Sequence, residues 1–134
     1  MTMLQVLPVL AYAGCVGTII AIATGSSVSD RTRWLIPAVL GVAFILFSLF
    51  QVSQDGIVQF WINHTTDLTG NQVWLDLVMA VTIGFYLLAP RARAVGMPLL
   101  PWGIAVFATA CIALLPMLAR VIWLENAQNG KAAV

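Results

Sequence analysis

Residues 34–53 read WLIPAVLGVAFILFSLFQVS and contain no Asp, Glu, Lys or Arg. A helix of about 20 consecutive apolar residues is long enough to cross the hydrocarbon core of a lipid bilayer. This stretch therefore predicts a membrane-spanning helix, and the rest of the chain is interpreted around it.

The composition of the whole chain agrees with a membrane protein. The 134 residues are 61% hydrophobic and 8% charged, whereas a soluble domain carries about a quarter of its residues as charged side chains. Six Lys and Arg residues against five Asp and Glu residues leave a net charge of +1, too weak to attract nucleic acid over a distance. The expected partner of most of the surface is the lipid bilayer.

Three further apolar segments, residues 4–24, 73–90 and 102–124, predict three more spans. The first begins without Lys or Arg, so we interpret it as a retained span rather than a cleaved signal peptide. Residues 54–72 predict a loop with an amphipathic segment in the interface, and Pro116 predicts a tolerated kink in the last span. The sequence thus predicts an all-α polytopic protein: four transmembrane helices in an up-down bundle over residues 1–125, followed by a loose polar tail, 126–134.

The basic residues of the short loops predict the orientation of the spans. Loops 25–33 and 91–101 each hold a pair of arginines, which are Arg31 and Arg33 in the first and Arg91 and Arg93 in the second. The loop between them along the chain holds no Lys or Arg. The positive-inside rule places these two loops in the cytoplasm and both termini outside. The expected location is the plasma membrane, which in a bacterium is the inner membrane. All five tryptophans lie near predicted span ends, where amphipathic rings are favourable.

The first span carries small residues at steps of four: Ala13, Gly17, Ala21 and Gly25. Such a stripe on one helix face lets another helix approach closely. Residues 102–124 carry a similar series, so the two stripes are expected to pack within the bundle or to dock a different protein.

Four polar residues are expected near the outer leaflet. Asp76 and Arg120 each lie about a turn inside an outer span end, so antiparallel neighbours would bring them to the same depth and pair them. Gln51 ends the second span on this side, and His64 lies in the adjoining loop. The group is either a structural ion pair with polar neighbours or a small polar binding site.

The sequence offers no pattern for a metal, a cofactor or a catalytic site. His64 is the only histidine, so a haem held by two histidines of this chain is excluded. Cys15 and Cys111 do not form a C-x-x-C pair, and no metal-ligand spacing occurs. We therefore expect no metal, no cofactor and no enzymatic activity.

Three short motifs carry a resemblance to a known family: WLDL at residues 74–77, RARAVGM at 91–97 and LLPML at 114–118, which precedes Arg120. From about residue 34 to 124 the chain resembles a family of small bacterial inner-membrane proteins of unknown function. That resemblance implies three helices with a polar outer loop after the first, so residues 4–24 look like an added helix. It implies a fold and a bacterial inner membrane, and no reaction.

Three functions are compatible with these features. The favoured function is that of a non-catalytic accessory or assembly subunit that packs against a larger membrane complex. Only analogy suggests that this complex is an energy-transducing one. The alternative is a small transporter or ligand-binding protein that uses the outer polar residues. A lipid-modifying enzyme is the third, and it lacks the convergent acid, base and metal groups that such chemistry needs.

Overall fold

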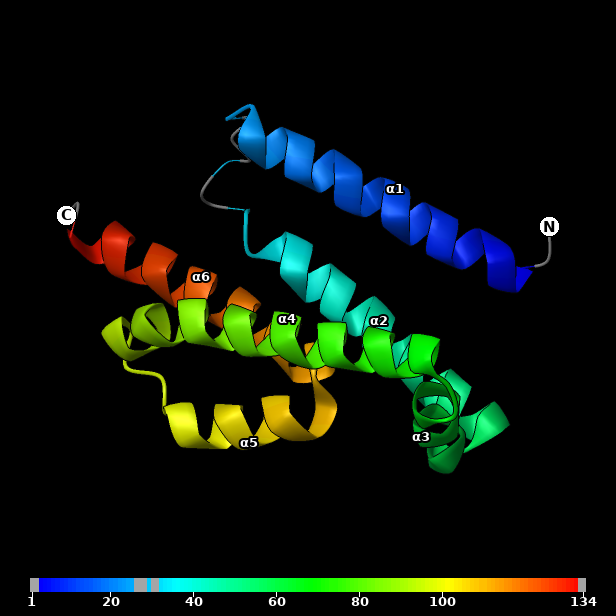
Figure 1. The fold of residues 1–134 in the computed structure, drawn as a ribbon. Coiled ribbons are helices and arrows are strands. Elements are labelled where there is room, and N and C mark those ends of the chain that lie inside the picture. Colours follow the sequence, from blue (N-terminus) through cyan, green and yellow to red (C-terminus); the bar gives the residue numbers. More distant parts are fainter. Residues whose placement is uncertain (1–2, 26–28, 30–31, 133–134) are drawn as a thin grey trace. The chain divides into compact units, whose positions relative to one another are not determined.

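The computed structural model describes residues 3–25, 29 and 32–132, and this part of the chain is all-α (Figure 1). It holds six helices: α1 (Met3–Ala23), α2 (Leu35–Asp55), α3 (Ile57–Thr65), α4 (Leu68–Ala94), α5 (Leu99–Thr109) and α6 (Cys111–Ala132). The chain divides into two compact units, Met1–Thr32 with α1 and Arg33–Val134 with the other five helices. Each unit is described by itself.

Three helices are long and apolar enough to cross a membrane: Gln5–Ala23 in α1, Leu35–Asp55 and Leu68–Ala94. Three such helices suggest a multi-pass membrane protein. The first two agree closely with the predicted spans 4–24 and 34–53. The third is longer than the predicted 73–90 at both ends, because Asp67 caps it earlier and because it continues through Pro90.

Helix α3 occupies the segment that was predicted to be amphipathic and interfacial. Gly56 separates it from α2 with a φ of 76°, a conformation that glycine adopts without steric cost. The nine residues of α3 then pack against the first turns of α4. The predicted loop 54–72 is therefore mostly helical.

The predicted fourth span, residues 102–124, is wrong as a single helix. The helix breaks at Ala110, which has a φ of 51° and a ψ of −122°, into α5 and α6. The Ala110 N–H donates to the carbonyl oxygen of Val106 at 2.7 Å, and the Ala110 carbonyl accepts from Ala113 and Leu114 at 3.2 and 3.1 Å. The turn therefore satisfies its own backbone groups, as it must where water is scarce.

Helix α6 runs parallel to α4 and antiparallel to α2. Leu114 lies against Gly84, where a Cβ would come within 2.9 Å of its side chain. Further toward the C-terminus of both helices, Glu125 of α6 pairs with Arg91 of α4, so the two helices run in the same direction. Helix α2 runs in the opposite direction to α6, as Figure 1 shows. The up-down arrangement predicted for the last span is therefore wrong: α5 and α6 form a hairpin, visible in Figure 1 beside α4.

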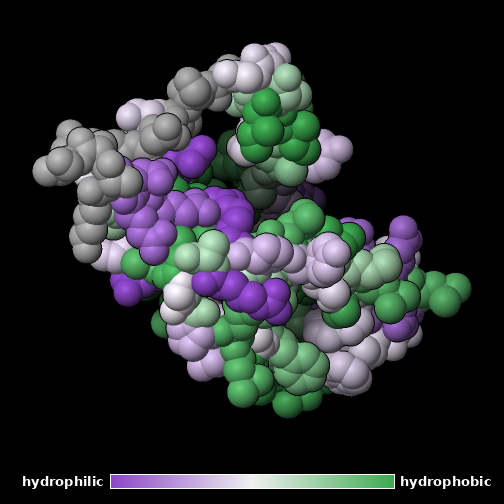
Figure 2. Space-filling view, turned by 90° about the vertical axis from the view of Figure 1, so that its left-hand side faces the viewer, coloured by the Kyte–Doolittle hydropathy of each residue, from purple (hydrophilic) through white to green (hydrophobic). Residues whose placement is uncertain are grey.

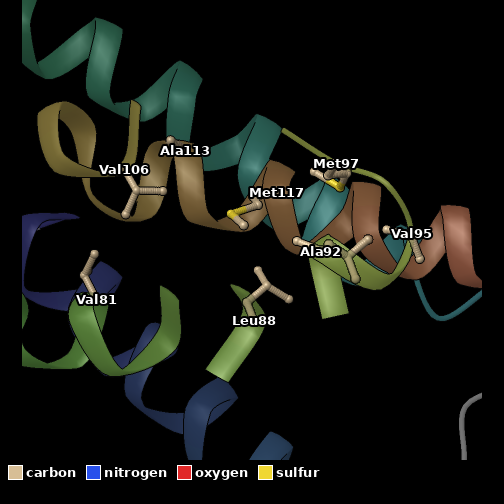
Figure 3. Close-up of a cluster of buried hydrophobic side chains, with 9 residues drawn as sticks. Val81, Leu88, Ala92, Val95, Met97, Val106, Ala113 and Met117 are labelled. Carbon is tan, nitrogen blue, oxygen red and sulfur yellow. The ribbon is translucent and has the colours of Figure 1, made fainter. Parts of the chain in front are cut away.

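The core of the larger unit lies between α4, α5 and α6. Its fully or nearly buried side chains, most of which are labelled in Figure 3, are Val81, Leu88, Ala92, Val95, Met97, Val106, Ala113, Met117 and Val121. The members on α6 recur every four residues, so one face of that helix supplies them. Helix α6 also contacts α2. It is thus the helix on which the other three pack.

The predicted loose tail, residues 126–134, is wrong in its described part. Helix α6 continues through it to Ala132. Residues 133–134 lie outside the described part of the chain.

Replacing Ala110 by glycine is expected to stabilise the protein by up to about 1 kcal/mol, because glycine adopts this positive φ without the cost that a Cβ imposes. Thermal unfolding of the full chain in detergent measures the change. Ala108→Gly is the control within α5, and it should destabilise by about 1 kcal/mol. Equal destabilisation by both variants would contradict the break and favour one continuous helix.

Enlarging Gly41 tests the contact of α2 with α6. A Cβ on Gly41 would already lie 3.3 Å from Cδ of Pro116, whose ring is rigid. Gly41→Leu is expected to destabilise by about 1–3 kcal/mol through overpacking. Ala43→Leu makes a similar enlargement at an exposed position of α2 and should change the unfolding temperature little. A neutral Gly41→Leu would show that α2 does not pack here.

Candidate functional site

The small-residue stripe lies mainly on α1. Ala13, Gly17 and Ala21 recur within this helix, whereas Gly25 lies in the turn after it with a φ of 70°. Gly25 therefore ends the helix rather than extending the stripe. Within α1 the three small residues share one face, which is the geometry that allows close helix packing.

The four polar residues expected at one site do not come together. Arg120 lines a groove with Trp34, at the start of α2, whereas Gln51 lies about 25 Å further along α2 at 1.5 Å per residue. Gln51 donates to Asp55 on its own helix, at 3.4 Å. Asp76 is exposed near the start of α4, and no ion pair of Asp76 occurs among the described residues. The predicted pair of Asp76 and Arg120 is therefore wrong, because it assumed that α6 runs antiparallel to α4.

His64 belongs to an aromatic cluster at the corner between α3 and α4. Its Nδ1 lies 2.7 Å from the carbonyl oxygen of Phe60, which only accepts, so Nδ1 carries the proton of this hydrogen bond. The ring of Trp74 lies 5.6 Å from Phe60, 5.9 Å from Trp61 and 6.1 Å from His64, measured between centroids. These contacts give His64 a structural environment, and they fix α3 on α4.

The same corner carries a shallow polar hollow of 250 Å³, which is lined by Asn63, His64, Asp67, Thr69, Gly70 and Val73. Asp67 caps α4 by accepting from the N–H of Gly70 at 2.7 Å. Gly70 is needed here, since a Cβ would lie 2.7 Å from the carbonyl oxygen of Asn63. Nowhere in the described residues do three or more His, Cys, Asp or Glu side chains gather as metal ligands.

The opposite end of the larger unit holds an ion pair that the sequence did not predict. Arg91 donates from Nε and Nη2 to the two carboxylate oxygens of Glu125, at 2.9 and 2.7 Å. The two-pronged geometry fixes the ends of α4 and α6 to each other. The hydrogen bond from Arg91 lowers the pKa of Glu125, although partial burial opposes this shift. Figure 2 shows hydrophilic residues gathered over this end.

A groove of 370 Å³ runs between α2 and α6. Its lining is apolar apart from one arginine, and consists of Trp34, Ala38, Val42, Ile45, Pro116, Ala119, Arg120 and Trp123. The guanidinium of Arg120 lies 4.8 Å from the ring centroid of Trp123, a cation–π contact. An exposed cation held over an aromatic ring at the mouth of an apolar groove is suited to an anionic group attached to an apolar chain.

Comparison with known proteins identifies no relative of this chain. No protein-family model, no curated protein and no solved structure matches the chain. The function is therefore argued from the residues and their geometry.

Glu125→Gln is expected to destabilise the protein by about 0.5–1 kcal/mol at neutral pH, because it removes the charge from a partly exposed pair and keeps the shape of the side chain. Unfolding in detergent as a function of pH measures the effect. The pKa of Glu125 is lower in the folded state than in the unfolded chain, so protonation favours unfolding. The wild-type advantage should therefore be complete at neutral pH, begin to fall near the ordinary glutamate pKa of about 4.3, and be lost as the pH falls through the lower pKa of the folded state. An advantage that does not change between neutral pH and the acid range would contradict this assignment.

Proposed function

We propose that this chain is a non-catalytic small membrane protein that acts as an accessory or assembly subunit and packs against a larger complex of the bacterial inner membrane. The resemblance to small bacterial inner-membrane proteins is part of the proposal, and an energy-transducing complex is one host class. The observation that carries it is helix α1, which forms a unit without a core of its own.

A single apolar helix has no interior, so α1 gains packing only from contacts outside its own unit. Its stripe of Ala13, Gly17 and Ala21 supports a close helix contact, because association within lipid relies on packing rather than on a hydrophobic drive. The stripe is thus the surface that we assign to a partner subunit.

Asp76 supplies a second contact position on α4. Its carboxylate is exposed near the start of α4, and the described residues offer it no cation. A carboxylate in lipid costs several kcal/mol unless it is paired or hydrated. A basic or hydrogen-bonding side chain of the partner at this depth would offset that cost.

The proposed orientation follows from the arginines and the hairpin together. Segments 25–33 and 91–101, the second of which includes the end of α4 and the start of α5, stay on the cytoplasmic side by the positive-inside rule, so the N-terminus lies outside. Since Glu125 pairs with Arg91, α6 ends on the same side as α4. We therefore place the C-terminus in the cytoplasm, which changes the earlier expectation of two outer termini and puts Arg120 and Lys131 on the side that the rule favours.

The transporter or ligand-binding alternative loses its predicted site. Gln51, His64, Asp76 and Arg120 are spread over both ends of the larger unit rather than gathered in one pathway. Enzymatic action on a lipid has no support from a cluster of acid, base and metal ligands in the described part of the chain.

The test is to tag the full chain at its C-terminus, solubilise the native membrane in a mild detergent, and identify the proteins that co-migrate on a native gel. The proposal expects one discrete complex of fixed stoichiometry. Ala13→Leu with Gly17→Leu should remove most of the tagged chain from that complex, since bulky side chains prevent close helix approach.

Cys15→Leu is the matched control, because Cys15 lies about 160° around α1 from the face of Gly17 at 100° per residue. It should leave the complex intact. Asp76→Asn should weaken co-migration without lowering the unfolding temperature of the isolated chain. Migration of the wild type alone, in every detergent and lipid mixture used, would overturn the proposal.

A further inference from the structure

The groove between α2 and α6 has the length of one membrane leaflet. Its lining residues on α2 extend from Trp34 to Ile45, about 16 Å along the helix axis. Half of a hydrocarbon core of about 30 Å is about 15 Å. The contact of Pro116 with Gly41 lies beside the groove and holds α2 and α6 together there. An acyl chain therefore matches the groove in length.

The depth of the groove places its mouth at a membrane surface. Trp34 precedes α2, and Trp123 lies two residues before Glu125, whose carboxylate marks the polar ends of α4 and α6. Tryptophan rings are favoured at the level of the lipid headgroups. The groove thus runs from the headgroup region toward the middle of the bilayer.

The chemistry of the mouth favours a negative headgroup. Arg120 is exposed, stacks on Trp123 and has no carboxylate partner within the described chain. No lining residue is acidic. A guanidinium presents several N–H donors in one plane and binds phosphate oxygens at two points. Glu125, the carboxylate two residues after Trp123, already pairs with Arg91.

We propose that this groove binds one anionic phospholipid, with an acyl chain lying between α2 and α6 along Ala38 and Val42 and the phosphate contacting Arg120. The occupant is a lipid of the leaflet that faces the ends of α4 and α6. This site lies within the larger unit and does not depend on the partner assigned to α1.

The experiment titrates the full chain, purified in detergent, with a phosphatidylglycerol or a phosphatidylcholine of the same acyl chains, and counts retained lipids by native mass spectrometry. The wild type is expected to retain one phosphatidylglycerol more tightly than phosphatidylcholine. Arg120→Gln should weaken phosphatidylglycerol about tenfold, because it removes a charge-assisted contact, and should leave phosphatidylcholine unchanged.

Two pairs of variants make the result specific. Arg93→Gln removes another exposed arginine at the same end of the unit, outside the groove, and should not change retention. Ala38→Phe should block the groove and lower retention of both lipids, whereas Val39→Phe, at an exposed neighbouring position, should not. Unfolding temperatures of all four variants confirm that they fold.

Three outcomes would overturn the proposal: equal retention of the two lipids by the wild type, an equal loss from Arg93→Gln and Arg120→Gln, or no effect of Ala38→Phe. None of these results bears on co-migration with a partner, so the two proposals fail separately.

Discussion

Close packing of one turn of α6 between two other helices holds the larger unit together. Leu114 lies on Gly84 of α4, while Leu115 and Pro116 lie on Gly41 of α2. A Cβ on either glycine would crowd these contacts, so the approach depends on the absence of a side chain at both positions. Apolar surface gives little drive for association inside lipid, and this contact area therefore contributes much of what keeps the helices together.

This packing explains why α6 can begin in the middle of the unit. Once Leu114 is fixed against Gly84, the preceding residues lie near the middle of α4, and α5 must return along α4 to reach it. Gly103 of α5 lies against Phe85 of α4, and this contact fixes α5, the other arm of the hairpin, on α4. The strained backbone at Ala110 is the local cost of that arrangement, and the packing of both arms offsets it.

Helix α2, helix α1 and most of α4 could be predicted from the sequence, because long apolar segments without charges have few alternatives to a spanning helix. The break at Ala110 could not, since alanine is the best helix former and residues 104–115 contain no Gly, Pro or Asn. The wrong prediction that Asp76 pairs with Arg120 followed from the missed break, because a single unbroken helix would have run antiparallel to α4.

The hairpin also affects how the chain enters a membrane. The hairpin of α5 and α6 begins and ends at the same end of α4, so in the proposed orientation the polar residues after Glu125, including Lys131, do not cross the hydrocarbon core. In that orientation only the segment between α2 and α4 and the N-terminal end of α1 lie on the outer side. The hairpin would then enter the bilayer with Ala110 leading, from the side on which α4 and α6 end.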